Sequence, residues 1–301
     1  MTDLTPPSPA SAPTLLATAR GPLELSTSGQ GPAVLALHGA MGGHDQSFLL
    51  ARTVGEAGYR YLAASRPGYL GTPLGAARSP AAQADLLVAG LDALGVEQAA
   101  VMAVSGGGPA ALELAIRHPS RCWGLVLVST CAGIMDNRIP LSFQLTKRLM
   151  RWAWFTELMR RKAAQDPDRA ASRSIPDPAL RARTLGDPEA GPLLRALLDS
   201  TLDRVAQRLD GTENDIAVTR STTYALERIT APTLVVHGTA DSVVDFGHAR
   251  QLAGRIPGAE LVEVEGGDHV SIFTHRALVQ PRVTAFLRRH APGAQARPVP
   301  A

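Results

Sequence analysis

The chain has 301 residues, of which 45% are hydrophobic and 19% are charged, a composition typical of a globular protein. Its formal net charge is only +3, and no basic stripe with interleaved aromatic residues accompanies that charge, so we expect no nucleic-acid partner. Two cysteines do not make a disulfide framework, and the absence of Cys-x-x-Cys and His-Glu-x-x-His motifs argues against a zinc site.

The start of the chain is rich in proline, serine and alanine and its end is rich in proline and alanine, so we expect residues 1–13 and 292–301 to be disordered. The first residues lack the basic and apolar regions of a secretory signal. No apolar run reaches the roughly 18 residues that a membrane span needs. We therefore expect a cytoplasmic protein with no membrane partner.

Short apolar runs alternate with helical patterns along most of the chain. In residues 80–94 leucines recur at helical spacing and Gly95 marks the end, and Pro119 closes the helical segment 107–118. Uninterrupted apolar strands separated by helices predict an α/β fold with a mostly parallel, doubly wound sheet covered on both faces. The expected strands are 34–37, 59–64, 99–104, 125–128, 232–236 and 260–264, and the expected helices are 80–94, 107–118, 247–256 and 275–290.

The alternation stops between residues 133 and 228. This segment is arginine-rich and helix-like, and prolines that include Pro167, Pro176, Pro178 and Pro188 interrupt it. We interpret residues 14–132 and 229–291 as one core and residues 133–228 as a helical cap inserted into it. Its apolar side chains could line a pocket, but we favour their packing the cap onto the sheet; they are Phe143, Trp152, Trp154, Phe155 and Met159.

The segment Ala103-Val104-Ser105-Gly106-Gly107 directly follows a predicted buried strand and opens a helix. A serine at such a tight turn is lifted above the sheet, and small neighbours let the turn close. A plain glycine-rich turn is the alternative. A phosphate-binding loop needs a following Gly-Lys-Ser/Thr, and a dinucleotide site needs Gly-x-Gly-x-x-Gly; neither is present.

A serine hydroxyl becomes a useful nucleophile only beside a base. Asp241 follows the predicted strand 232–236, and His269 follows the predicted strand 260–264. The chain order serine, aspartate, histidine is the one expected for a nucleophile on such a turn. All three residues follow the carboxyl ends of strands, where parallel sheets place their sites. We therefore predict a catalytic triad of Ser105, Asp241 and His269.

Three other acidic residues compete for the role of Asp241. Asp245 is expected to cap the helix that follows it, and Asp268 is expected to be a loop residue beside the histidine. Asp136 follows the predicted strand 125–128, which comes before the strand that leads to Asp241. Asp241 fits best because it lies in the loop directly after its strand.

Acyl transfer also needs hydrogen-bond donors for the negative charge that develops on the substrate oxygen. We expect one oxyanion-hole donor to be the backbone N–H of Gly106, which follows the nucleophile. The other should come from the loop after the strand 34–37, and Ala40 is the predicted donor, with Met41 as the alternative.

With these residues, the chain resembles the α/β-hydrolase superfamily, in the branch with a helical cap. The resemblance implies a sheet of about eight strands, no cofactor, and a Ser–His–Asp site between sheet and cap. Ala103 departs from the usual glycine, and Asp245 stands where similar loops often carry proline. The matching segments are 38–40, 66–71, 103–107, 232–241 and 266–269.

We therefore predict hydrolysis of an ester or related acyl bond in a small-molecule substrate. The same triad serves carbon–carbon bond, lactone or amide hydrolysis and perhydrolysis, and these stay open. A binding protein with a weak or silent site is an alternative of another class, and a regulatory or scaffolding protein is a third. The sequence predicts neither the substrate nor the oligomeric state.

Overall fold

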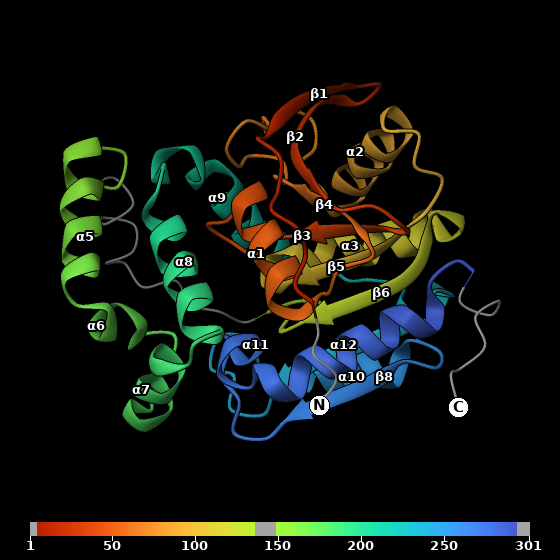
Figure 1. Cartoon of the computed structure of the whole chain (residues 1–301). Coiled ribbons are helices and arrows are strands. Elements are labelled where there is room, and N and C mark those ends of the chain that lie inside the picture. Colours follow the sequence, from red (N-terminus) through yellow and green to blue (C-terminus); the bar gives the residue numbers. More distant parts are fainter. Residues whose placement is uncertain (1–4, 136–148, 294–301) are drawn as a thin grey trace.

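The computed structural model describes residues 5–135 and 149–293. Within them, eight strands form one sheet in the order β1-β2-β4-β3-β5-β6-β7-β8 (Figure 1). Strand β2 is antiparallel to both its neighbours, β1 and β4. The strands β4, β3, β5, β6, β7 and β8 run parallel to one another. The predicted mostly parallel sheet is thus confirmed. The strands are β1 (Thr14–Thr18), β2 (Gly21–Ser28), β3 (Ala33–Leu37), β4 (Arg60–Ala64), β5 (Ala99–Val104), β6 (Cys122–Val128), β7 (Thr233–Gly238) and β8 (Glu260–Val264).

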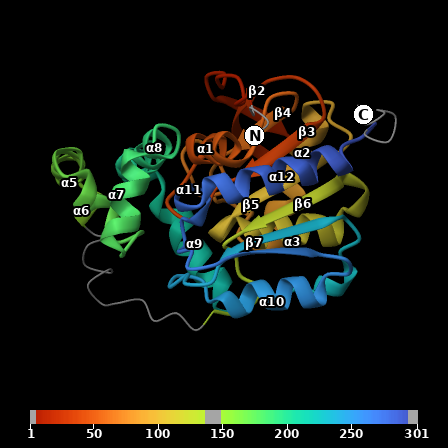
Figure 2. The ribbon, with the colours of Figure 1, turned by 60° about the horizontal axis from the view of Figure 1, so that its bottom comes forward.

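Helices cover both faces of the sheet, as the apolar strands require (Figure 2). Alternate residues of β3 illustrate why: Val34 belongs to the core under α1 and α12, whereas Leu35 belongs to the core under α2 and α3. Helix α10 packs on β7 and β8. The helices around the sheet are α1 (His44–Val54), α2 (Pro80–Ala93), α3 (Gly108–Arg117), α10 (Phe246–Arg255), α11 (Ser271–Thr274) and α12 (Arg276–His290), with short 3₁₀ turns η1 (Ser105–Gly107), η2 (Pro119–Arg121) and η4 (Leu226–Arg228).

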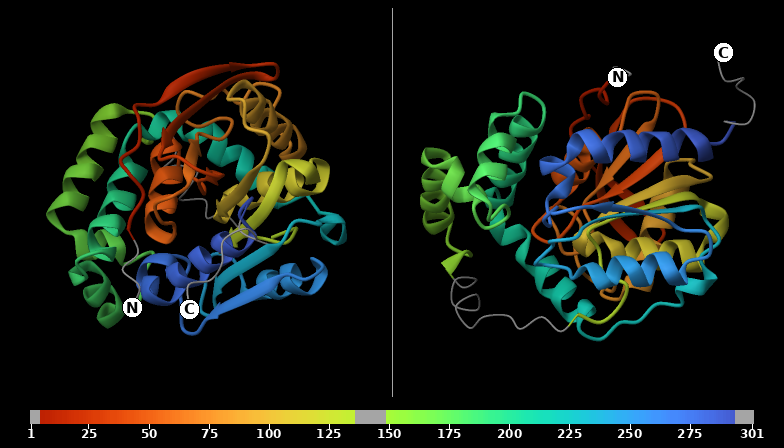
Figure 3. Two further views of the ribbon diagram at one scale, coloured as in Figure 1. Left: turned by 45° about the vertical axis from the view of Figure 1, so that its right-hand side comes forward. Right: turned by 90° about the horizontal axis from the view of Figure 1, so that it is seen from below.

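A group of helices lies between β6 and β7 in the chain and stands beside the sheet (Figure 3). We call its described part, residues 149–228, the helical insertion. Helix α8 packs against α1 and α11, and α5 packs on the far side of α8. The elements of the helical insertion are α5 (Ala153–Gln165), α6 (Pro167–Ala171), α7 (Pro178–Gly186), α8 (Ala190–Leu202), η3 (Val205–Gln207) and α9 (Leu209–Thr219).

The aromatic cluster of the helical insertion does not lie where we expected. Trp152 and Trp154 are 61% and 60% exposed, so the expectation that they pack the insertion onto the sheet is wrong. The reason is that α5 rests on other helices of the insertion and contacts α8 and α6. Phe155 and Met159 are half-buried on the same helix, and Phe143 lies outside the described residues.

The N-terminal segment also differs from the expectation of disorder. The Ser11 N–H donates to the Thr27 carbonyl of β2, and the Ala57 N–H donates to the Thr5 carbonyl, both at 2.8 Å. Backbone groups need no particular side chains to pair, so a segment of this composition can still form such hydrogen bonds. Of the C-terminal segment 292–301, only residues 292 and 293 are described. None of the described helices is long and apolar enough to cross a bilayer.

Candidate active site

Ser105 sits on the turn that joins β5 to α3. Its φ is +50°, a backbone conformation that L-residues seldom adopt, and its side chain is half-buried rather than enclosed in the core. The Thr130 hydroxyl donates to the Ser105 carbonyl at 2.6 Å and ties the turn to the end of β6. Ala103, which replaces the expected glycine, is fully buried within β5, so its methyl group is accommodated before the turn begins.

Small residues surround this serine because the backbone passes close to it. A Cβ added at Gly39 would lie 3.1 Å from the Ser105 Cβ. A Cβ added at Gly106 would lie 2.8 Å from a carboxylate oxygen of Asp215 and 3.2 Å from the Ala40 nitrogen. A side chain at Gly39 would therefore press on Ser105, and one at Gly106 would press on Asp215 and Ala40.

The three residues of the predicted triad lie together. The Ser105 Oγ is 3.0 Å from His269 Nε2, and His269 Nδ1 is 2.8 Å from Asp241 Oδ2. They come from the carboxyl ends of β5, β8 and β7, which the parallel sheet brings to one edge. The arrangement is one in which imidazole can accept the serine proton while the carboxylate orients the ring.

Asp241 is held in its ionised form. Its Oδ1 accepts hydrogen bonds from the backbone N–H groups of Val243 and Val244 at 2.8 and 2.9 Å. Burial raises the pKa of the Asp241 carboxyl, but hydrogen bonds from His237 and His269 outweigh burial and hold that pKa well below its usual value. The contact with His237, 3.3 Å from Oδ2, was not foreseen from the sequence.

The other candidate acids have different partners. Asp245 accepts the N–H of Gly247 and caps α10, as predicted. The Oδ1 of Asp268 accepts the N–H of Val270, so Asp268 is a loop residue, as expected. Burial raises the pKa of Asp268 to about 6, and the nearby Asp241 charge adds to the effect. Asp136 lies outside the described residues.

The two predicted oxyanion-hole donors lie on neighbouring turns. The added-Cβ distance above places the Ala40 nitrogen beside Gly106, and Ala40 is exposed. The alternative donor, the Met41 N–H, is already bonded to the Thr212 hydroxyl at 3.1 Å. The geometry therefore favours Ala40 over Met41 as the partner of Gly106.

Comparison with known proteins now assigns the family. The family model described as "alpha/beta hydrolase fold" matches residues 32–276, which include every residue of the site above. The chain belongs to the α/β-hydrolase fold family. A solved structure, an "alpha/beta hydrolase fold protein" from Nakamurella multipartita, is 35% identical to this α/β-hydrolase. The match covers 92% of this chain and 99% of the chain in that structure, and the two superpose with a TM-score of 0.82.

Curated relatives of this α/β-hydrolase carry varied names. A pimeloyl-[acyl-carrier protein] methyl ester esterase of Aromatoleum aromaticum is 28% identical over 227 residues, which are 73% of this chain and 84% of the relative. The polyketide synthase ThaQ of Burkholderia thailandensis is 31% identical over 202 residues, which are 65% of this chain. The chain spans only 9% of that synthase.

A buried ion pair beside the triad was missed by the sequence analysis. The guanidinium of Arg66 makes two hydrogen bonds to Asp215, at 2.8 and 2.6 Å, and the Tyr69 hydroxyl donates to the same carboxylate at 2.6 Å. Arg66 and Tyr69 belong to the segment 66–71 that carries the family resemblance. Asp215 lies in α9, where one acidic residue among several on the helix gives no signal in the sequence.

A separate cavity of about 740 Å³ lies between the loop 68–78 and α9. Its lining includes Leu70, Arg78 and Asn214 and none of the three triad residues. Within residues 5–135 and 149–293, no group of three or more His, Cys, Asp and Glu side chains is arranged to hold a metal ion.

Proposed function

We propose that this α/β-hydrolase cleaves an ester or related acyl bond of a small-molecule substrate through an acyl-enzyme. The observation that carries the proposal is the hydrogen-bonded line from the Ser105 hydroxyl through His269 to Asp241. A serine with a base in hydrogen-bond reach, and the base oriented by a carboxylate, is the arrangement that activates a hydroxyl for attack. The esterase among the relatives supports the choice of an ester over other acyl bonds.

In the first half of the reaction, the Ser105 Oγ attacks the substrate carbonyl carbon and its proton passes to His269 Nε2. The carbonyl electron pair moves onto oxygen, and the N–H groups of Gly106 and Ala40 donate to that oxyanion. Collapse of the intermediate expels the alcohol, which takes the proton from His269. A water molecule then repeats these steps on the acyl-enzyme and releases the acid. Throughout, Asp241 orients and stabilises the protonated ring.

In this proposal the two parts of the chain have different tasks. The core, residues 14–132 and 229–291, carries the triad, and the segment 133–228, which includes the helical insertion, acts as a cap over the carboxyl edge of the sheet. The position of Asp215 supports this division, because a residue of α9 comes within a few ångströms of Gly106.

The test is to remove the nucleophile. Ser105→Ala should lower kcat for p-nitrophenyl esters by roughly 10⁴-fold or more and abolish covalent labelling by a fluorophosphonate probe. Asp241→Asn should lower kcat by about 10³- to 10⁴-fold, because the ring loses its correct tautomer. Esters of increasing chain length, measured beside amides and lactones, identify the bond class.

A matched control is Ser129→Ala. Ser129 also follows a strand and has a positive φ, +46°, and its buried hydroxyl has no hydrogen-bond partner among the described residues. This variant should still label and turn over. A wild-type protein that neither labels at Ser105 nor hydrolyses any member of the panel would contradict the proposal and favour a ligand-binding role.

A further inference from the structure

The peptide group between Gly39 and Ala40 is fixed from its carbonyl side. The Gly39 oxygen accepts a hydrogen bond from Arg66 Nη2 at 3.2 Å and another from His38 Nδ1 at 2.6 Å. In a trans peptide the carbonyl and the following N–H lie in one plane and point in opposite directions. Whatever holds the Gly39 oxygen therefore also sets the direction of the Ala40 N–H, the proposed oxyanion donor.

His38 can make this bond because its ring has a defined tautomer. The Arg66 backbone N–H donates to His38 Nε2 at 2.9 Å, so the proton resides on Nδ1 and is donated to the Gly39 oxygen. The ring is fully buried, and burial together with the Arg66 charge lowers its pKa well below the usual value. The ring accordingly remains neutral while it holds the peptide.

Arg66 is in turn held by the helical insertion. Its side chain is 1% exposed, and its Nε donates to the His38 carbonyl at 2.9 Å. Its two terminal nitrogens bind the carboxylate of Asp215, a residue of α9 that lies 149 positions away in the sequence. A bidentate arginine–carboxylate pair fixes the plane of the guanidinium as well as its position.

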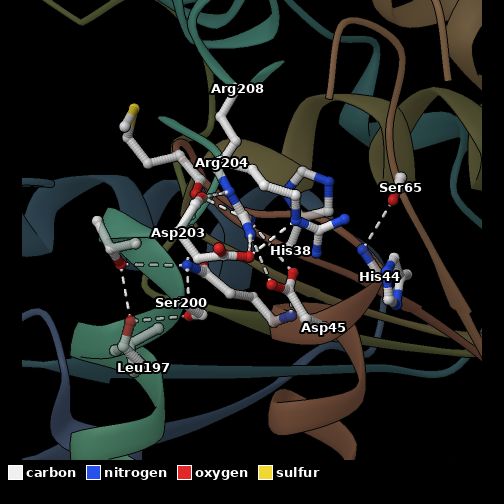
Figure 4. A network of polar contacts seen from close by, with 12 residues as sticks. His38, His44, Asp45, Ser65, Leu197, Ser200, Asp203, Arg204 and Arg208 are labelled. Carbon is white, nitrogen blue, oxygen red and sulfur yellow. Dashed lines mark hydrogen bonds and ion pairs between the residues drawn. The ribbon is translucent and has the colours of Figure 1, made fainter. Parts of the chain in front are cut away.

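The other side of Ala40 is also attached to the helical insertion. The Met41 N–H donates to the Thr212 hydroxyl of α9, and the Met41 carbonyl accepts from Arg208 Nη1 at 3.3 Å. Arg208 is fully buried and binds Asp45 of α1 through Nη2 at 2.6 Å (Figure 4). Contacts from the insertion thus reach the peptide on each side of the proposed donor.

We propose that Arg66 and Thr212 are positioning residues of the oxyanion hole, and that the helical insertion, through Asp215, holds the Ala40 N–H in its productive direction. The inference rests on the proposed function. An oxyanion donor acts only if it points at the oxygen as charge develops, so misdirecting it slows the chemical step without weakening substrate binding. A merely structural ion pair would instead change only the amount of folded enzyme.

Two substitutions separate these roles. Arg66→Lys keeps the positive charge but loses the fork that binds Asp215 and Gly39 together. Thr212→Val keeps the shape of the side chain but removes the acceptor of the Met41 N–H, and Thr212→Ser restores it. The matched control is Arg181→Lys, because buried Arg181 also binds a carboxylate, that of Asp168, and the carbonyl of Ile175, far from this loop in the helical insertion.

The measurement is kcat per labelled serine, with the active enzyme counted from the end point of fluorophosphonate labelling. For a p-nitrophenyl ester, Arg66→Lys and Thr212→Val should each lower kcat roughly tenfold or more with little change in KM. A trifluoromethyl ketone adds the Ser105 oxygen to its carbonyl carbon and places an oxyanion in the same site. Its inhibition constant should rise by a similar factor.

The outcomes are distinct. Wild-type kcat per labelled serine in both variants overturns the positioning inference and leaves the proposed function intact. An equal loss in Arg181→Lys overturns it as well, because the effect would then be a general one. If Arg66→Lys does not fold, the two variants at position 212 decide. A kcat per labelled serine that falls in Thr212→Val but not in Thr212→Ser supports the inference, and an equal kcat in both overturns it. A wild-type enzyme with no turnover and no label overturns the proposed function and this inference together.

Discussion

At the residue scale, two aspartates, Asp241 of the proposed triad and Asp268 beside its histidine, lie close together in the structure but differ in environment. Asp241 accepts backbone and imidazole hydrogen bonds, which stabilise its charge. The Oδ2 of Asp268 is buried and has no hydrogen-bond partner among the described residues. The same residue type is therefore ionised at one position and resists ionisation at the other, as expected when hydrogen bonding and desolvation oppose each other.

This difference predicts how stability depends on pH. Because the pKa of Asp268 is raised to about 6 in the folded protein, its contribution to stability is fully present below its unfolded pKa near 4 and is lost as pH rises through 6. Asp268→Asn should thus raise the free energy of unfolding by about 1–2 kcal/mol at pH 8, with no gain near pH 4. Urea denaturation at several pH values measures the difference.

Asp187→Asn is the control, and it should change the free energy of unfolding in the opposite direction. The exposed Asp187 carboxylate accepts two backbone N–H groups at the start of α8, and these bonds lower its pKa. Its removal should destabilise the protein at neutral pH, and the effect should fade in acid. An Asp268→Asn protein that is less stable than wild type at pH 8 would show that the buried carboxylate has a partner after all.

At the element scale, α9 lies unusually close to the loop after β4. The Gly211 N–H donates to the Gly68 carbonyl at 2.9 Å, and Gly68 has a φ of +85°. A Cβ at Gly211 would overlap the ring of Tyr69, which donates to Asp215. The absence of a side chain at Gly211 is what allows α9 to bring Asp215 and Thr212 to the candidate active site.

We predict that Gly211→Ala lowers the free energy of unfolding by about 1–3 kcal/mol, because the added methyl group forces the helix and loop apart. Gly254→Ala in α10 is the matched control. A Cβ there meets nothing within 4 Å, so the better helix propensity of alanine should stabilise the protein by about 0.5–1 kcal/mol. Thermal unfolding of the two variants compares them directly, and a neutral Gly211→Ala would mean that the contact is not tight.

At the scale of the whole molecule, one tryptophan is buried in the core and two are exposed on the surface. Trp123 in β6 is 8% exposed and donates to the Ala33 carbonyl at 3.2 Å. Trp152 and Trp154 are exposed at the start of α5, and α5 is the helix of the insertion that lies farthest from the sheet (Figure 1). The insertion is therefore attached to the core through α7, α8 and α9 and not through Trp152 and Trp154.

Fluorescence quenching tests this division. In Trp123→Phe, the two remaining tryptophans should be quenched readily by acrylamide, whereas in the double variant Trp152→Phe/Trp154→Phe the remaining emission should be protected. Trp154→Ala should change the free energy of unfolding by less than about 0.5 kcal/mol, whereas Trp123→Ala should lower it by about 3–5 kcal/mol. Protection of the residues on α5 would indicate that something covers this edge.

The sequence by itself determined the mostly parallel sheet and predicted the three residues of the proposed triad. Apolar runs such as 99–104 have to be buried on both faces, and small residues such as Gly106 are required wherever the backbone passes close to a side chain. Both requirements act on residues that are neighbours in the chain, so they can be recognised in a short stretch of sequence. The strands β1 and β2 escaped the strand-by-strand prediction because their burial is partial.

Only the tertiary structure decided which residues of the helical insertion reach the site. Asp215 and Thr212 belong to an ordinary-looking stretch of polar residues, and nothing in their immediate neighbours sets them apart from Asp210 or Glu213. Their partners, Arg66 and Met41, lie about 150 and 170 positions away. A hydrogen bond between distant segments depends on how helix and sheet pack in three dimensions, and that packing has no counterpart in the spacing of residues along the chain.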